Sequence, residues 1–478
     1  MSFETAGYQL LPVLPELVLA VGAMLLLMLG AFRGQGTTAL VTWLAVCLLV
    51  ATGAIELMLP AGRLTTFGGS FIVDGFARFL KIVALISSVA TLLLSVEFVS
   101  DPSRRIFEYS ILVLLSTLGM MVLISAGDLI VLYLGLELMS LALYVVAASD
   151  RDNTKSTEAG LKYFVLSALA SGMLLYGASL IYGFTGTVSF AGIAAAAKTG
   201  SIGIVFGIVF LLAGLCFKVS AVPFHMWTPD VYEGAPTPVT TFFASAPKVA
   251  AMAVFVRVAM TAFPGITSEW QQIVVFVSIA SMALGAFAAI GQKNIKRLMA
   301  YSSIGHMGYA LIGLAAGTAE GAQGVLVYMA IYVAMTLGAF AVILAIKRDG
   351  QAFEEISDFA GLSRTNPLLA FFFAMFLFSL AGAPPLAGFF AKWYVFVAAI
   401  KAGLFTLAVI GVLTTVIGAF YYLAVIKVMY FDDPLAKLDP TRVEVSTVVA
   451  VTGLFNILFF FYPGPLVSAA TTAAKSLF

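Results

Sequence analysis

Apolar runs of about 20 residues or more follow one another along almost the whole chain, and only short polar connections separate them. A run of this length crosses the hydrocarbon core of a bilayer as an α-helix. Charged residues make up only 10% of the chain, whereas a soluble domain carries about 25%. The sequence therefore predicts an all-α polytopic membrane protein.

Fourteen transmembrane helices fit these runs, and the short connections favour a single membrane domain, 1–478, without a soluble module. The first run follows a segment that contains Glu4 and no basic residue, which favours a first helix over a cleaved signal. The helices are expected at 10–32, 38–60, 72–98, 108–126, 128–148, 158–183, 202–225, 237–262, 270–291, 298–317, 322–346, 366–400, 402–430 and 445–470.

Composition also excludes several functions. The net charge of +1 does not indicate the strongly basic surface that nucleic-acid-binding proteins carry. The two cysteines, Cys47 and Cys216, lie in apolar runs and are too few for an iron–sulfur cluster, which needs four ligands. We find no P-loop, no dinucleotide fingerprint and no metal-ligating cluster. The chain is therefore expected to carry no redox centre of its own.

The distribution of Lys and Arg predicts the orientation, because basic residues accumulate in cytoplasmic connections. With both termini on the periplasmic side of a bacterial inner membrane, the inward connections carry most of these residues. They hold Arg33, Arg104, Arg105, Arg151, Lys155, Lys293, Lys296, Arg297, Lys347, Arg348, Arg364, Lys437 and Arg442, against Arg63, Lys198, Lys401 and Lys475 outside.

Five ionisable residues are predicted deep within the membrane, where uncompensated charge is costly and usually functional. Glu137, Lys218, Lys248, His306 and Lys392 each lie well inside an apolar run. A purely structural role as buried pairs is the alternative, but one acid cannot balance three lysines. For His306 alone, a packing role with ordinary hydrogen bonds is as reasonable as a functional one.

Other intramembrane basic residues have a simpler interpretation. Arg78 and Lys81 follow Asp74 at helical spacing, so we expect a local ion pair whose cations extend towards the membrane surface. Lys162 and Arg257 lie near a membrane face and are expected to do the same, and Lys427 is expected at the interface.

Prolines adjoin three of the buried lysines. Pro223 follows Lys218, Pro247 precedes Lys248, and the Ala383–Pro385 segment precedes Lys392. Broken helices at mid-membrane are typical of transporters, although simple kinks are also common. The prolines predict that helices 7 and 12 are discontinuous. The lysines of these two helices are five helices apart, so the helices cross the membrane in opposite directions, as two inverted five-helix repeats would produce. The expected parts are 10–98 (helices 1–3), 108–262 (helices 4–8), 270–430 (helices 9–13) and 445–470 (helix 14).

Two motifs resemble those of a known family. P-F-H-M-W-T-P-D-V-Y-E-G-A-P-T-P-V at 223–239, followed by A-P-K at 246–248, is similar to the antiporter-like membrane subunits of respiratory complex I. So is N-I-K-R-L-M-A-Y-S-S-I-G-H-M-G-Y at 294–309. The resemblance covers essentially helices 4–13.

The resemblance implies a proton-translocating subunit of NADH:quinone oxidoreductase. It implies that Glu137 pairs with Lys218, that Lys248 is a connecting lysine and that Lys392 serves the second half-channel. His306 matches a position that is polar in the family but varies in identity. Our hypothesis is that the proton passes from Lys218 through Lys248 and His306 to Lys392. FMN, iron–sulfur clusters and the reaction of NADH with a quinone such as ubiquinone are implied in partner subunits, beside neighbouring antiporter-like subunits. The alternatives are a subunit of a multisubunit sodium/proton antiporter and a structural spacer that moves no ions.

Overall fold

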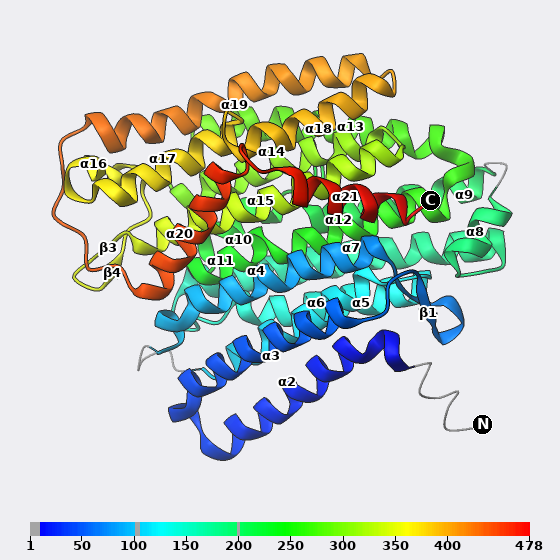
Figure 1. Cartoon of the computed structure of the whole chain (residues 1–478), viewed down its shortest axis with the longest axis horizontal. Helices are drawn as coiled ribbons and strands as arrows, with labels where there is room; N and C mark the ends of the chain where they lie inside the picture. Colours follow the sequence, from blue (N-terminus) through cyan, green and yellow to red (C-terminus); the bar gives the residue numbers. More distant parts are fainter. Residues whose placement is uncertain (1–9, 101–105, 198–200) are drawn as a thin grey trace. The chain divides into compact units, whose positions relative to one another are not determined.

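The computed structural model describes residues 10–100, 106–197 and 201–478, and these residues are almost entirely helical (Figure 1). Arg104, Arg105 and Lys198 of the charge count, and Glu4 of the N-terminal segment, lie outside them.

Two short antiparallel hairpins join helices: β1 (Leu64–Thr66) with β2 (Phe71–Val73), and β3 (Lys347–Arg348) with β4 (Gln351–Ala352). The α-helices are α2 (Leu14–Arg33), α3 (Thr38–Met58), α4 (Gly75–Ser100), α5 (Glu108–Ile124), α6 (Leu129–Ala147), α7 (Thr154–Thr185), α8 (Phe190–Ala196), α9 (Ile202–Val219), α10 (Trp227–Gly234), α11 (Thr237–Ala244), α12 (Ala246–Arg257), α13 (Thr267–Ile290), α14 (Ile295–Ala315), α15 (Ala319–Ala345), α16 (Leu362–Thr365), α17 (Pro367–Ala381), α18 (Ala387–Lys401), α19 (Phe405–Phe431), α20 (Val443–Leu458) and α21 (Gly464–Lys475).

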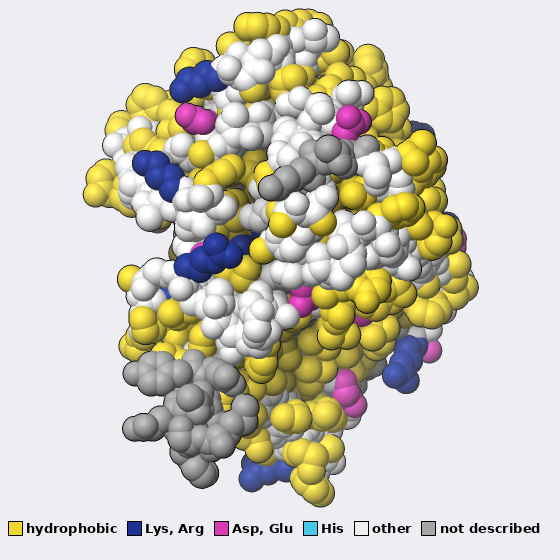
Figure 2. All heavy atoms as spheres, turned by 90° about the vertical axis from the view of Figure 1, so that its right-hand side faces the viewer, with side chains coloured by type: hydrophobic (Ala, Val, Ile, Leu, Met, Phe, Trp, Pro, Cys, Tyr) yellow, Lys and Arg dark blue, Asp and Glu magenta, His cyan; other side chains and the backbone are white. Residues whose placement is uncertain are grey.

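Ten helical segments of the described residues are long and apolar enough to cross a membrane, and α5, α17 and α20 are shorter apolar helices. On the face drawn in Figure 2, hydrophobic side chains form broad areas while Lys, Arg, Asp and Glu appear as isolated groups. The prediction of an all-α polytopic membrane protein is therefore confirmed.

The residues cluster into two compact units, of which the first comprises Met1–Val219, Ala246–Ile273 and Ala469–Phe478. Within it α5 packs on α6, α7 on α9, and α12 against α4, α5 and α9. Glycines permit the closest approaches. A Cβ on Gly119 of α5 would lie 2.3 Å from the Met139 nitrogen of α6, so only glycine fits there. Small residues allow such backbone contact between membrane helices.

The second unit comprises Ser220–Ser245 and Val274–Ser468. Its central element is α15, which contacts α11, α14, α17, α18 and α20 and whose most apolar 18-residue window is 94% buried. A helix that is covered by neighbours on all sides needs apolar residues around its whole circumference, and α15 has them.

Helices end where the sequence has prolines and glycines. Helix α9 ends at Val219, earlier than the expected 225, and Ser220 takes a left-handed conformation with φ 64°. Helix α17 ends at Ala381, and α18 begins at Ala387 beyond the Pro384–Pro385 pair. The prediction of one continuous last helix, 445–470, is wrong. Helix α20 ends at Leu458 and α21 begins at Gly464, because Pro463 cannot continue the hydrogen-bonding pattern of α20.

Candidate functional site

Lys218 lies in the last turn of α9, in the first unit, with 5% of its surface exposed. Its Nζ donates hydrogen bonds to the hydroxyls of Ser140 on α6 (2.7 Å) and Ser167 on α7 (2.6 Å). Tyr144 donates to the same Ser167 hydroxyl at 2.6 Å, and its ring lies 5.9 Å from Nζ. The ammonium group is therefore solvated by neutral hydroxyls and an aromatic face.

Glu137 also lies on α6, almost one turn before Ser140, and is half-buried. Its charge acts on Lys218, but the two side chains form no ion pair within the described part of the chain. The expected direct Glu137–Lys218 pair is therefore not formed in this structure. Among the described residues, no donor forms a hydrogen bond to the buried Oε1 atom of Glu137.

Lys248 lies in the first turn of α12, in the first unit, with 1% of its surface exposed. Ser245 separates α11 from α12 with φ −121° and ψ −91°, so the chain breaks just before the lysine. The neighbouring helices of its unit are α4, α5, α6 and α9. Lys218 and Lys248 thus each lie at the end of a helix that the sequence interrupts.

His306 lies in the middle of α14, in the second unit, and is 2% exposed. Its Nδ1 is 2.7 Å from the Tyr328 hydroxyl of α15, and its Nε2 is 3.2 Å from the Tyr422 hydroxyl of α19. Tyr422 also bonds to Ser302, one turn before His306. The imidazole is therefore held between hydroxyl groups on two different helices.

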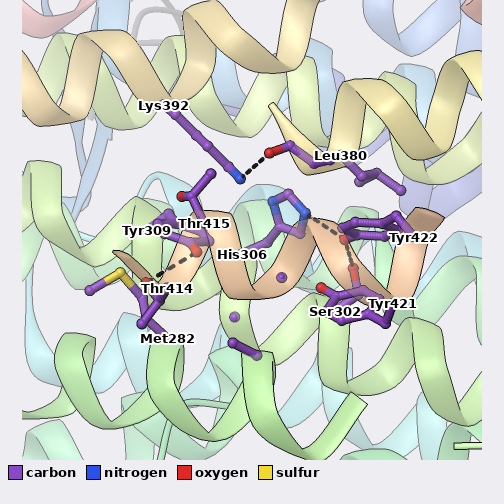
Figure 3. Close-up of a pocket in the computed structure, with 14 residues that line it drawn as sticks. Met282, Ser302, His306, Tyr309, Leu380, Lys392, Thr414, Thr415, Tyr421 and Tyr422 are labelled. Atoms are coloured by element: carbon purple, nitrogen blue, oxygen red, sulfur yellow. Dashed lines mark hydrogen bonds between the residues drawn. The ribbon is translucent and has the colours of Figure 1, made fainter. Parts of the chain in front are cut away.

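Lys392 of α18 lines a cavity in the second unit together with His306 (Figure 3). Its Nζ donates to the Ala381 carbonyl at 2.9 Å, at the broken end of α17, and lies 4.5 Å from the centre of the Tyr309 ring. Tyr309 in turn donates to Thr414 of α19 at 3.2 Å. The structure therefore brings His306 and Lys392 to one cavity, and Glu137 and Lys218 to one cluster.

The cavity suits proton movement. The space open to the centre of a water molecule is about 10 Å³, which is roughly what one ordered water needs. Hydroxyl and imidazole groups both donate and accept hydrogen bonds, and they line this cavity from α14 and α19. A proton can therefore pass from group to group without free charge entering lipid.

The acidic residues of the first motif serve a structural role in the second unit. Arg297 of α14 contacts Asp230 (2.8 Å) and Glu233 (3.1 Å) of α10. Lys296 pairs with Glu354 at 2.7 Å and donates to the Ala235 carbonyl at 3.0 Å. These contacts fasten the segment between the two broken helices to the start of α14.

Sequence reasoning missed two buried ion-pair clusters in the first unit. Arg257 does not extend to the membrane surface. It is 1% exposed and binds Asp74 through two hydrogen bonds of 2.8 and 2.9 Å. Burial alone would raise the pKa of Asp74, but the charge and hydrogen bonds of Arg257, together with the Ala77 N–H and the charge of Arg63, lower this pKa overall.

The expected local pair of Lys81 with Asp74 is also wrong. Lys81 is fully buried and contacts Glu16 of α2 at 2.6 Å and Glu56 of α3 at 3.5 Å. Its partners come from helices far away in the sequence, so spacing within α4 could not reveal them. Lys162, in contrast, is 42% exposed and pairs with Glu158, as a residue at the surface can.

The tyrosines around His306 were also not singled out. Tyr328 and Tyr332 are four residues apart on α15, and Tyr421 and Tyr422 are adjacent on α19. Tyr332 bonds to Ser303 at 2.7 Å. The signal available in the sequence is the presence of four tyrosines on two apolar helices. A buried tyrosine hydroxyl usually requires a hydrogen-bond partner, so these tyrosines indicate a polar network.

Comparison with known proteins identifies the family. A family model described as the transmembrane part of NADH:quinone oxidoreductase and Mrp antiporters matches residues 126–418. The chain is 65% identical over 466 residues to NADH-quinone oxidoreductase subunit N of Azorhizobium caulinodans, covering 98% of each chain. The chain belongs to the antiporter-like membrane subunit family of NADH:quinone oxidoreductase.

Other members of this family agree with that placement. Subunit N of Methylobacterium nodulans is 62% identical over 470 residues, with 98% of each chain covered. A chain of respiratory complex I from Thermus thermophilus is 33% identical with a TM-score of 0.83, covering 95% of this chain and 98% of that one. These relatives show that the chain is of the subunit N type, and the D-V-Y-E-G variant at 230–234 agrees with this. A chain of the Mrp complex from Dietzia sp., at 22% identity and a TM-score of 0.83, shares the fold.

Proposed function

We propose that this family member is a proton-translocating membrane subunit of a bacterial NADH-quinone oxidoreductase, in which Glu137, Lys218, Lys248, His306 and Lys392 carry the protons. The observation that supports this most directly is a buried lysine beside a helix break in each unit, contacted by neutral polar groups or a peptide carbonyl. Buried lysines can lose their proton, which is what a carrier requires.

In the first unit, Lys218 is the group that is loaded from the cytoplasmic side. Hydrogen bonds to a charged group contribute about 1.5–3 kcal/mol each, and Lys218 makes two of them. Moving one charge against ~200 mV costs roughly 4.6 kcal/mol. Rearranging the serines, or moving the half-buried Glu137 towards the ammonium, therefore involves enough energy to drive one proton step.

In the second unit, the proton passes along His306 and its tyrosine partners, and Lys392 releases it to the periplasmic side. Lys248, in the first unit, acts between the loading of Lys218 and the release from Lys392. The hydroxyl groups of Tyr422 and Ser302 extend the hydrogen-bonded chain from the histidine. Ordered water in the cavity of Figure 3 supplies the contact between His306 and Lys392.

We further propose that the fold contains fourteen membrane-crossing helices with two inverted five-helix repeats, 108–262 and 270–430, in one membrane domain. The breaks at Val219 and Ala381 support this, because they occur in the seventh and twelfth of the expected helices. The basic-residue distribution supports periplasmic termini. FMN, iron–sulfur clusters and the quinone-reducing site then belong to partner subunits.

Purification in a mild detergent tests the assignment to the oxidoreductase. The chain is expected to co-purify with FMN, iron–sulfur clusters, neighbouring antiporter-like subunits and NADH-dependent quinone reduction. Recovery in a complex that lacks flavin and exchanges sodium for protons would instead support the antiporter. Pumping that survives neutralisation of both Lys218 and Lys392 would support a structural spacer.

A further inference from the structure

A second group of intramembrane charges lies in α2, α3 and α4, outside both proposed repeats. Lys81 of α4 lies between two carboxylates, with its Nζ 2.6 Å from Oε1 of Glu16 and 3.5 Å from Oε2 of Glu56. Glu16 is in the first turn of α2 and Glu56 is near the end of α3. Three helices thus contribute one charged residue each to a single cluster.

The cluster is closed off from water. The exposed fractions of Glu16, Glu56 and Lys81 are 3%, 0% and 0%. The Phe71 ring lies 5.0 Å from the Lys81 ammonium, and Phe71 packs with Leu59 and Val73 in a small hydrophobic cluster. Besides the ion pairs with Lys81, the carboxylate oxygens have no hydrogen-bond donor among the described residues. The two carboxylates are therefore out of contact with bulk water.

Charge counting leaves one carboxylate over. Within the described residues, Lys81 is the one cation at ion-pair distance from Glu16 or Glu56. Arg78 attracts Glu56 from a greater distance but forms no ion pair with it among the described residues, and its guanidinium is bound to the carbonyls of Leu59 and Pro60. Asp74, which precedes α4, is compensated by its two hydrogen bonds to Arg257.

We propose that Glu16, Glu56 and Lys81 form a proton-binding site of the α2–α4 helices, with the proton on Glu56. Lys81 stays protonated and pairs with ionised Glu16, its nearer partner. The proton on Glu56 removes the uncompensated negative charge, which would otherwise be buried at high cost. If the ammonium moves from Glu16 to Glu56, the proton moves in the opposite direction. The site is therefore an exchangeable proton store separate from the proposed path.

Infrared spectroscopy of the purified complex tests this assignment. A protonated carboxylic acid has a C=O stretch that an ionised carboxylate lacks, and the band shifts in D₂O once the proton exchanges. We expect Glu56→Gln to remove one such band while the complex assembles at the wild-type level. Glu16→Gln should also remove the band, because Glu56 then ionises to pair with Lys81. Glu158→Gln is the matched control, since Glu158 is an exposed ion-pair partner of Lys162, and it should change nothing in this region.

Assembly provides a second measurement that does not depend on pumping. The double variant Glu16→Gln/Glu56→Gln leaves Lys81 without an acid and should fail to assemble, and adding Lys81→Met should restore assembly. A band unchanged in both single variants would show that Glu56 carries no proton and would overturn the proposal. Loss of assembly in Glu56→Gln would show that a neutral group cannot replace Glu56 and would overturn it as well. Retention of radioactive sodium by the wild type, lost in Glu56→Gln, would overturn it in favour of a sodium site. If a Lys218 variant pumps normally, the proposed function fails, but the infrared and assembly results for Glu16 and Glu56 keep their meaning.

Discussion

At the scale of single residues, the contacts of Lys218 explain why a charge can be kept in its place. Its partners, Ser140 and Ser167, are neutral and come from two different helices. We expect Ser140→Ala/Ser167→Ala to lower NADH-driven proton uptake in inverted vesicles about tenfold or more, because two hydrogen bonds of about 1.5–3 kcal/mol are lost. Ser171→Ala is the control, since Ser171 is one turn from Ser167 and its hydroxyl has no hydrogen-bond partner among the residues that the structure describes. Equal uptake in the double variant and the control would contradict a role for this serine pair.

Lys392 allows the carrier role to be separated from charge balance. Arginine keeps the positive charge but is effectively always protonated. If Lys392 carries the proton, Lys392→Arg should impair uptake almost as much as Lys392→Ala at matched complex content. Lys401→Arg, at the exposed end of the same helix, should behave as wild type. Wild-type uptake in Lys392→Arg would remove this lysine from the path.

At the scale of helices, the break between α17 and α18 depends on close packing. A Cβ on Gly388 would lie 1.8 Å from the Ser379 carbonyl oxygen, and the Gly388 N–H donates to the Ser379 hydroxyl at 3.0 Å. We expect Gly388→Ala to force the two half-helices apart and to reduce the amount of assembled complex by at least severalfold. The measurement is quantitative immunoblotting of native gels.

Gly172→Ala is the matched control for this substitution. Gly172 lies on the membrane helix α7, and its Cβ would meet nothing within 4 Å. The two variants therefore share the chemical change and differ only in the available space. Equal loss of complex in both would attribute the effect to alanine at a membrane glycine in general, and not to the break.

A helix break could be predicted from the sequence where a single proline causes it. Prolines at 223 and 384–385 lie in the interruptions after α9 and α17, because proline acts through its own backbone. The contacts that hold a break were not predictable. The Ser379 hydroxyl donates to Asn456 of α20 at 2.8 Å, and these residues are far apart in the sequence. Such a contact follows from how the helices pack, which spacing along one helix does not encode.

At the scale of the whole molecule, the orientation in the membrane stays a prediction from charge. We expect a cysteine added after Phe478 to react with a membrane-impermeant maleimide from the periplasmic face, and Gly234→Cys to react only from the cytoplasmic face. The background should carry Cys47→Ala, because Cys47 is exposed whereas Cys216 is buried. Labelling of position 234 from the periplasmic face would invert the proposed orientation.

The candidate site, like the helix breaks, could be predicted only where the information is local in the sequence. The burial of the five predicted residues, which is partial for Glu137, could be predicted because each ionisable side chain interrupts its own apolar run. Which residues meet could not be found in this way. Glu137 and Lys218 are expected to pair, yet Lys218 bonds to serines on α6 and α7. Lys81 and Arg257 are expected to extend towards the surface, yet they are buried and bind acids on other elements. A one-dimensional pattern shows that a charge is buried, whereas its partner depends on the packed structure.

The bond from Lys392 to the Ala381 carbonyl has a further consequence. The last carbonyls of a helix have no partner in the helix and carry about half a negative charge. A peptide carbonyl cannot be neutralised by a proton at any physiological pH, so a change of protonation at the carbonyl cannot release Lys392. The two lysines therefore differ in kind, because the serine hydroxyls that bind Lys218 can rotate, whereas the carbonyl that binds Lys392 is fixed to the backbone. Release of Lys392 from this carbonyl would then require motion of α17 or α18, whereas rotation of two side chains would release Lys218.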